Sequence, residues 1–218
     1  MVPFMEQRHY TFADRALMNL DQGLRTLFGR PPVTGRPNPA DDHPEQPLAA
    51  GERELAGRLM RINHAGEVSA QALYQGQALT ARLAEVRGRM EQAALEENDH
   101  LAWCEQRINE LGGHTSYLNP AWYLGSLAIG AAAGVAGDKW SLGFVAETER
   151  QVVRHLEGHL QRLPDADDRS RAILDQMRRD EQHHATVALE SGGAELPGPV
   201  RALMGMVSKV MTRTAYWV

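Results

Sequence analysis

Two Glu-x-x-His pairs, each preceded by a lone glutamate about 30 residues earlier in the chain, constrain the fold most strongly. Within a helix, residues three positions apart lie on one face, so each pair directs a carboxylate and an imidazole the same way. The sequence therefore predicts two helix pairs that form a degenerate internal repeat. The six residues of the pattern are Glu67, Glu97, His100, Glu149, Glu181 and His184.

The remaining sequence predicts an all-α protein. Alanine, leucine, glutamate, glutamine and arginine are abundant and favour helix, whereas β-branched and aromatic residues are sparse. An apolar, glycine-rich segment follows Pro120, and residues 201–218 place apolar side chains at the spacing of an amphipathic helix. Long helical patterns run over four ranges: 52–86, 89–111, 141–163 and 168–190.

Residues 31–51 are rich in proline, glycine and aspartate, a composition that disfavours helix and is typical of a linker. We therefore expect residues 1–51 to be a peripheral N-terminal extension and linker, and residues 52–218 to form one domain. The N-terminus lacks the uninterrupted apolar run and cleavage site of a secretory signal, so export is not indicated.

Charge and cysteine content exclude several classes of site. The net charge is −5 without a block of lysine and arginine, so nucleic-acid binding is not expected. Cys104 is the only cysteine, which excludes an intrachain disulfide and a thiolate zinc site. A reducing cytoplasmic compartment is compatible with this cysteine content.

Residues 121–137 are at the lower length limit for a membrane span. We expect their small residues to make a close helix contact rather than a membrane packing motif.

Neighbouring residues indicate which glutamates face the interior. Glu149 shares its helix face with apolar side chains such as Val145 and Leu156, where a charge without a partner is costly. Glu147 shares a face with arginine and glutamine side chains, so we expect it to lie in solvent.

The same comparison favours Glu97 over Glu96 and His184 over His183 as interior residues. Glu67 is the weakest case, because its face also carries polar residues that could support a metal ligand. These residues are Asn63, His64, Gln71 and Tyr74.

The pattern matches the ligands of helix bundles that hold two iron or manganese ions: one glutamate from each of two helices and Glu-x-x-His from each of two others. We therefore expect a ferritin-like four-helix bundle with a long crossover, extra apolar and C-terminal helices, and two iron ions. Two Fe(II) ions can together supply two electrons to dioxygen. No nucleotide-binding G-x-G-x-x-G fingerprint is visible, so we expect an external reductant. The electrons would come from a partner protein, from the substrate or from a reductant that docks directly.

Four stretches resemble the demethoxyubiquinone hydroxylases, which are di-iron monooxygenases of ubiquinone biosynthesis. The H-A-G-E stretch that ends at Glu67 and the run that ends at His100 are specific to that family. The resemblance covers about residues 52–218, and residues 1–50 lie outside it. The stretches are RINHAGEVSAQALYQGQAL, EENDHLAWCEQRINELGGHTSYLNP, VAETERQVVRHLEGHL and DEQHHATVALESGGAELP.

The resemblance implies that the same six residues bind iron and that the chain hydroxylates a demethoxyubiquinol ring with dioxygen. It also implies a peripheral position at the cytoplasmic face of a bacterial inner membrane. The C-terminal helix, which ends in Tyr216 and Trp217, would suit capture of a hydrophobic quinol there. Packing within the bundle, in a homo-oligomer or against a biosynthetic partner would explain this helix equally well.

Two other functions use the same residues. A ferritin-like ferroxidase or iron store would need assembly into a shell but no lipid contact. A non-catalytic helical scaffold with a structural metal is the third possibility, although ligands for two metals with open positions argue against it.

Overall fold

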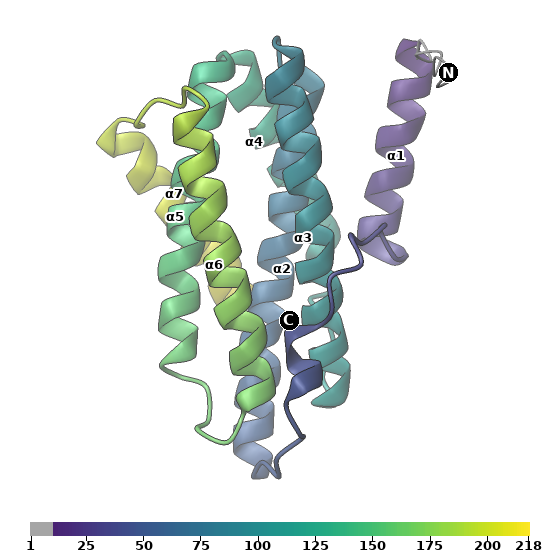
Figure 1. Cartoon of the computed structure of the whole chain (residues 1–218), viewed down its shortest axis with the longest axis vertical. Helices are drawn as coiled ribbons and strands as arrows, with labels where there is room; N and C mark the ends of the chain where they lie inside the picture. The colour runs from purple at the N-terminus through teal and green to yellow at the C-terminus, as the bar shows by residue number, and fades with distance from the viewer. Residues whose placement is uncertain (1–10) are drawn as a thin grey trace, which may run out of the picture.

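The computed structural model describes residues 11–218, and these form helices and loops without a strand, which confirms the all-α prediction. In chain order the elements are α1 (Phe12–Phe28), the 3₁₀ helix η1 (Pro39–Asp42), α2 (Ala50–Thr80), α3 (Ala84–Glu110), α4 (Asn119–Val135), α5 (Asp138–Leu160), α6 (Asp168–Glu190) and α7 (Gly198–Ala215). Helices α2, α3, α5 and α6 run side by side as a four-helix bundle (Figure 1). Helix α4 lies in the long crossover from α3 to α5.

The crossover helix packs closely along α2 because glycines line the contact. A Cβ atom at Gly130 would lie 2.2 Å from the carbonyl oxygen of Leu73, and one at Gly76 would lie 2.3 Å from that of Leu127. Larger side chains would force the two helix backbones apart. The small-residue segment therefore makes the close helix contact that the sequence favoured. Among residues 11–218, no helix is both long and apolar enough to cross a membrane.

The first bundle helix ends earlier than the sequence pattern predicts. Helix α2 stops at Thr80 instead of residue 86, and α3 begins at Ala84 instead of residue 89. The carboxylate of Asp138 accepts hydrogen bonds from the backbone N–H groups of Arg82 (3.0 Å) and Leu83 (2.9 Å). This contact stabilises the turn from a point more than 50 residues away, which helical periodicity cannot reveal.

The N-terminal segment contributes more contacts than a linker composition suggests. It contains α1, which begins with a capping box between Thr11 and Asp14. Residues 30–49 form no α-helix, yet Ala40 is only 1 % exposed within an apolar cluster. Glu45 also forms an ion pair of 2.5 Å with the buried Arg107 of α3. The division of the chain at residues 51 and 52 remains a prediction.

Two buried apolar clusters fill the bundle interior at different heights along the helices. One cluster includes Met60, Cys104 and Met177, so the single cysteine lies in the core. The other includes Tyr74 and Val145. The lone glutamates and the Glu-x-x-His pairs occupy the stretches between these clusters, so the bundle interior has apolar layers on both sides of a polar layer.

Candidate metal centre

The bundle brings all six residues of the sequence pattern together in its interior. The lone glutamates come from α2 and α5, and the Glu-x-x-His pairs come from α3 and α6, one residue set from each bundle helix. Each of the six is at most 8 % exposed, in a protein interior where an uncompensated carboxylate is costly. Oxygen or nitrogen atoms of four of them lie within 4.8 Å of one another: Glu67, Glu97, His100 and Glu181.

Glu97 and Glu181 occupy the middle of the cluster, because each contacts both histidines. The Nδ1 atom of His100 lies 3.0 Å from Glu97 Oε2 and 3.1 Å from Glu181 Oε1. The Nδ1 atom of His184 lies 3.3 Å from Glu97 Oε1 and 3.2 Å from Glu181 Oε2. Two carboxylates that each reach two imidazoles have the arrangement expected of ligands shared between two metal ions.

The lone glutamates complete opposite halves of the cluster. Glu67 Oε2 lies 3.8 Å from His100 Nδ1. Glu149 interacts with Glu181 and accepts a hydrogen bond from the hydroxyl of Tyr74. The geometry thus gives one half with Glu67 and His100 and another with Glu149 and His184.

The pKa shifts within the cluster favour bound protons when no metal balances its charge. Burial raises the pKa of Glu67 and of Glu149, and the charge of neighbouring carboxylates raises both further. Burial opposes protonation of His100 and His184, but the surrounding carboxylates raise the pKa of each imidazole. Burial likewise opposes ionisation of Glu97, yet the two imidazoles lower its pKa. Two divalent cations could replace these protons.

Unused oxygen atoms support a metal in the cluster. Glu97 Oε1 and Glu181 Oε1 are buried and accept no well-directed hydrogen bond from the described residues, although each lies beside an imidazole nitrogen. Buried carboxylate oxygens normally have such partners. Oxygen and imidazole donors in this combination suit iron or manganese, so the residues present fit the metals that the sequence predicts.

Two acidic residues that the sequence pattern placed outside the cluster hold the histidines from behind. Asp180 Oδ2 lies 2.9 Å from His100 Nε2, and Glu96 Oε2 lies 2.7 Å from His184 Nε2. Each acidic residue immediately precedes a cluster glutamate on its own helix and contacts a histidine on the facing helix: Asp180 of α6 contacts His100 of α3, and Glu96 of α3 contacts His184 of α6. Glu97 is more buried than Glu96 and His183 is exposed, as predicted, but the carboxylate of Glu96 turns towards His184 and supports the cluster, which the sequence comparison did not anticipate.

Two interpretations of the sequence need correction. Glu147 is only 5 % exposed, because its carboxylate is covered by Arg154 and Gln151 rather than by solvent. Among the polar neighbours of Glu67, Tyr74 does support the cluster, but through Glu149. Asn63 bonds instead to His159 on α5, at 2.9 Å.

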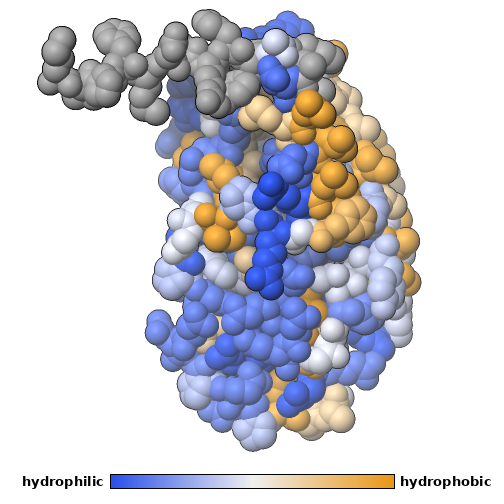
Figure 2. Space-filling model, turned by 90° about the vertical axis from the view of Figure 1, so that its right-hand side faces the viewer, coloured by the Kyte–Doolittle hydropathy of each residue, from blue (hydrophilic) through white to orange (hydrophobic). Residues whose placement is uncertain are grey.

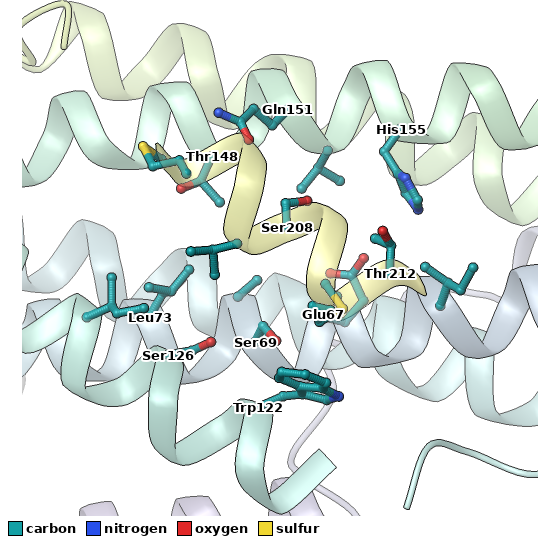
Figure 3. Close-up of a pocket in the computed structure, with 18 of the residues that line it drawn as sticks. Glu67, Ser69, Leu73, Trp122, Ser126, Thr148, Gln151, His155, Ser208 and Thr212 are labelled. Carbon is teal, nitrogen blue, oxygen red and sulfur yellow. The ribbon is translucent and has the colours of Figure 1, made fainter. Parts of the chain in front are cut away.

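An apolar cavity of about 310 Å³ opens beside the cluster, between α2, α4, α5 and α7. Its volume is at the lower end of the range of small-molecule sites. Figure 3 shows Glu67 among the side chains that line it, together with Trp122 of α4 and Thr212 of α7. Glu67 therefore belongs both to the carboxylate cluster and to the cavity wall.

Comparison with known protein families matches residues 54–215 to the family described as ubiquinone biosynthesis protein COQ7. The chain belongs to this family. Curated relatives named 3-demethoxyubiquinol 3-hydroxylase match the chain over nearly its whole length. The relative from Nitrosococcus oceani is 64 % identical over 214 residues, which cover 98 % of this chain and 100 % of the relative.

Two other members carry the same name. The relative from Nitrosomonas eutropha is 60 % identical over 205 residues, covering 94 % of this chain and 98 % of the relative. The relative from Azotobacter vinelandii is 59 % identical over 213 residues, covering 96 % of this chain and 98 % of the relative. These matches confirm the family resemblance drawn from the sequence and extend it over most of residues 1–50.

Proposed function

We propose that this chain is a di-iron monooxygenase that hydroxylates the ring of a 3-demethoxyubiquinol with dioxygen. The observation that carries the proposal is the double position of Glu67, which joins the buried carboxylate and histidine cluster to the wall of the apolar cavity. A quinol ring in this cavity would lie beside the cluster, and the apolar walls would exclude water from it.

The six residues of the cluster are the proposed iron ligands. Glu67 and His100 would bind one ion, Glu149 and His184 the other, and Glu97 and Glu181 would lie between both. When bound, two Fe(II) ions supply two electrons and open positions at which dioxygen can be reduced.

The overall reaction balances with one external two-electron reductant. One atom of dioxygen enters the ring C–H bond as a hydroxyl group, and the other leaves as water with two protons and two electrons from the reductant. The protein's part is to orient the ring, exclude solvent and hold the ligands deprotonated. Asp180 and Glu96 would contribute by accepting hydrogen bonds from Nε2–H of the two histidines, which directs Nδ1 towards the metal.

The mouth of the cavity supports peripheral contact with a membrane. Four apolar residues line the cavity and are at least 39 % exposed: Ile129, Val200, Leu203 and Val207. Arg201 and Lys209 of the same α7 helix are exposed and would favour anionic headgroups. On another side of the molecule, the one that carries α1, apolar side chains gather on the upper part of the face shown in Figure 2, whereas hydrophilic ones dominate its lower part. We propose that the protein takes its quinol from the cytoplasmic face of a bacterial inner membrane.

Membrane contact can be tested by binding to vesicles that contain anionic phospholipid. Leu203→Glu places a charge at the cavity mouth and should weaken binding at least tenfold. Leu83→Glu changes a leucine of similar exposure, 60 % against 57 %, in the turn between α2 and α3, and should have little effect. Equal binding by the wild type and Leu203→Glu would contradict the proposed surface.

The hydroxylation is tested by supplying ¹⁸O₂ to the iron-loaded protein with 3-demethoxyubiquinol and a chemical reductant. Mass spectrometry should find one ¹⁸O atom in the hydroxylated quinol. Iron oxidation without a labelled product, together with assembly into a large shell, would instead support the ferroxidase alternative.

A further inference from the structure

The N-terminal segment ties an arginine to two acidic residues beside the cluster. Arg36 Nε lies 2.7 Å from Asp99 Oδ2 of α3, and Arg36 Nη1 lies 2.7 Å from Asp180 Oδ2 of α6. The backbone N–H of Thr34 donates to Asp99 Oδ1 at 2.8 Å. The guanidinium also lies 5.0 Å from the ring centre of Trp103, so three side chains fix its position.

Asp180 transmits this contact to a residue of the cluster. The oxygen of Asp180 that binds Arg36 also lies 2.9 Å from His100 Nε2, on the side of the ring opposite to the carboxylates. Because Nε2 is directed at Asp180, the other ring nitrogen, Nδ1, faces Glu97 and Glu181 and is the one that would bind a metal after losing its proton. Arg36 therefore fixes the carboxylate that fixes the orientation and tautomer of His100.

The other half of the cluster lacks an equivalent ion pair. Glu96 holds His184 in the same way, but its own partner is the neutral amide of Gln92, at 3.0 Å. Among residues 11–218, no arginine or lysine forms an ion pair with Glu96. The charge of Arg36 makes only a small contribution to the lowered pKa of Glu96, after the hydrogen bonds from His184 and Gln92. Its side chain is 29 % exposed, against 15 % for Asp180. The two halves therefore differ in how rigidly their histidines are held.

We propose that Arg36 is a positioning residue of the metal centre, which acts through Asp180 on His100 and makes the half with Glu67 and His100 the first to bind metal. The inference rests on the metal centre proposed above and assigns a role in it to a segment outside the bundle. A preorganised ligand loses less freedom when it binds metal, so its affinity is higher.

The test is a titration of the metal-free full-length chain with Co(II) alone, followed by visible absorption, which reports on ligand geometry. The wild type should bind two ions in two resolved steps. Arg36→Gln should weaken the first step about 10- to 100-fold and change its spectrum, while the second changes less than about threefold. Arg36→Lys keeps the charge but cannot contact both carboxylates in the same way, so it should restore only part of the affinity.

Glu45→Gln is the matched control for loosening of the N-terminal segment. It removes the ion pair of that segment with Arg107 but leaves Arg36 and Asp180 unchanged. Both Co(II) steps should keep the wild-type affinity. An equal loss in Glu45→Gln and Arg36→Gln would overturn the proposal, because general loosening would then explain both.

A double-mutant cycle with Asp180→Asn tests whether Arg36 acts through this residue. In the Asp180→Asn background, Arg36→Gln should have little further effect on the first step. Full additivity, or an unchanged first step in Arg36→Gln, would refute the positioning role. If the wild type bound no Co(II), the proposed metal centre itself would fail, an outcome distinct from failure of the Arg36 proposal alone.

Discussion

Replacement of Glu149 by glutamine separates the cost of burying this carboxyl from its proposed role as a ligand. Glu149 is 1 % exposed, and burial together with the charges of Glu181 and Glu97 raises its pKa above the ordinary value of 4.5. Glutamine has nearly the same shape, carries no charge, and its carbonyl oxygen can still accept the hydrogen bond from Tyr74. The substitution should therefore preserve the fold.

The stability of the metal-free protein should increase at neutral pH. In the unfolded chain Glu149 ionises around pH 4.5, whereas in the folded protein its raised pKa favours the protonated form at higher pH, so wild-type stability falls as pH rises above 4.5. At about 1.4 kcal/mol per pH unit, holding the carboxyl protonated at pH 7 costs up to about 3 kcal/mol. The variant avoids this cost. Its advantage should shrink to about 1 kcal/mol at pH 5, where the unfolded carboxyl is less fully ionised.

Urea unfolding at pH 5 and pH 7, with and without Fe(II) under anaerobic conditions, measures both effects. With iron the order should reverse, because the variant lacks an anionic ligand and gains little stability from metal. Glu147→Gln is the control: Glu147 is also buried on α5 but pairs with Arg154 outside the cluster, so its stabilisation by iron should match the wild type. A metal-free Glu149→Gln protein less stable than the wild type at pH 7 would refute the reasoning.

Three further predictions follow from the cluster and its surroundings. Because the pKa values of Glu67, Glu149, His100 and His184 are raised, binding of divalent ions at pH 7 should release protons. Calorimetry in buffers of different ionisation enthalpy measures this release, and metal binding without it would contradict the assignment. Ala70→Phe places a ring in the cavity beside Glu67 and should lower kcat/KM for the quinol about tenfold or more. The variant should still bind two metal ions. Unchanged kinetics would show that the cavity does not hold substrate. Burial, with smaller contributions from His155 and Arg162, lowers the pKa of His159 to about 2, so the unfolded state takes up a proton below pH 6.5 that the folded state does not. From pH 7 to pH 5 the metal-free wild type should therefore lose about 2 kcal/mol relative to His159→Gln in urea unfolding, and parallel losses would disprove this.

The sequence predicted the bundle and the six clustered side chains because both depend on local periodicity. A Glu-x-x-His pair on one helix face, with apolar neighbours such as Leu101 and Met177, indicates an interior position without knowledge of the partner helix. The ligand roles of these residues remain predictions, since the structure shows their proximity and burial. The family match supports the same fold independently.

Contacts between distant segments were beyond the reach of the sequence pattern. Arg36 lies in a proline-rich stretch that resembles a linker, and its contact with Asp180 joins residues 144 positions apart. Glu96 and Asp180 lie at the edge of the interior face, where periodicity suggests solvent and only the neighbouring helix supplies a histidine. Glu147 was misassigned for a similar reason, since its arginine and glutamine neighbours cover it instead of marking an exposed face.

The central claim is that the six residues hold two irons that together support hydroxylation of the quinol. The most direct test titrates the metal-free chain anaerobically with Fe(II), then adds 3-demethoxyubiquinol, reductant and dioxygen, and measures hydroxylated product at each iron level. Product formation should rise to a plateau at two Fe(II) per chain, with little product below one. A plateau at one iron per chain, or no product at any iron level, would contradict the account.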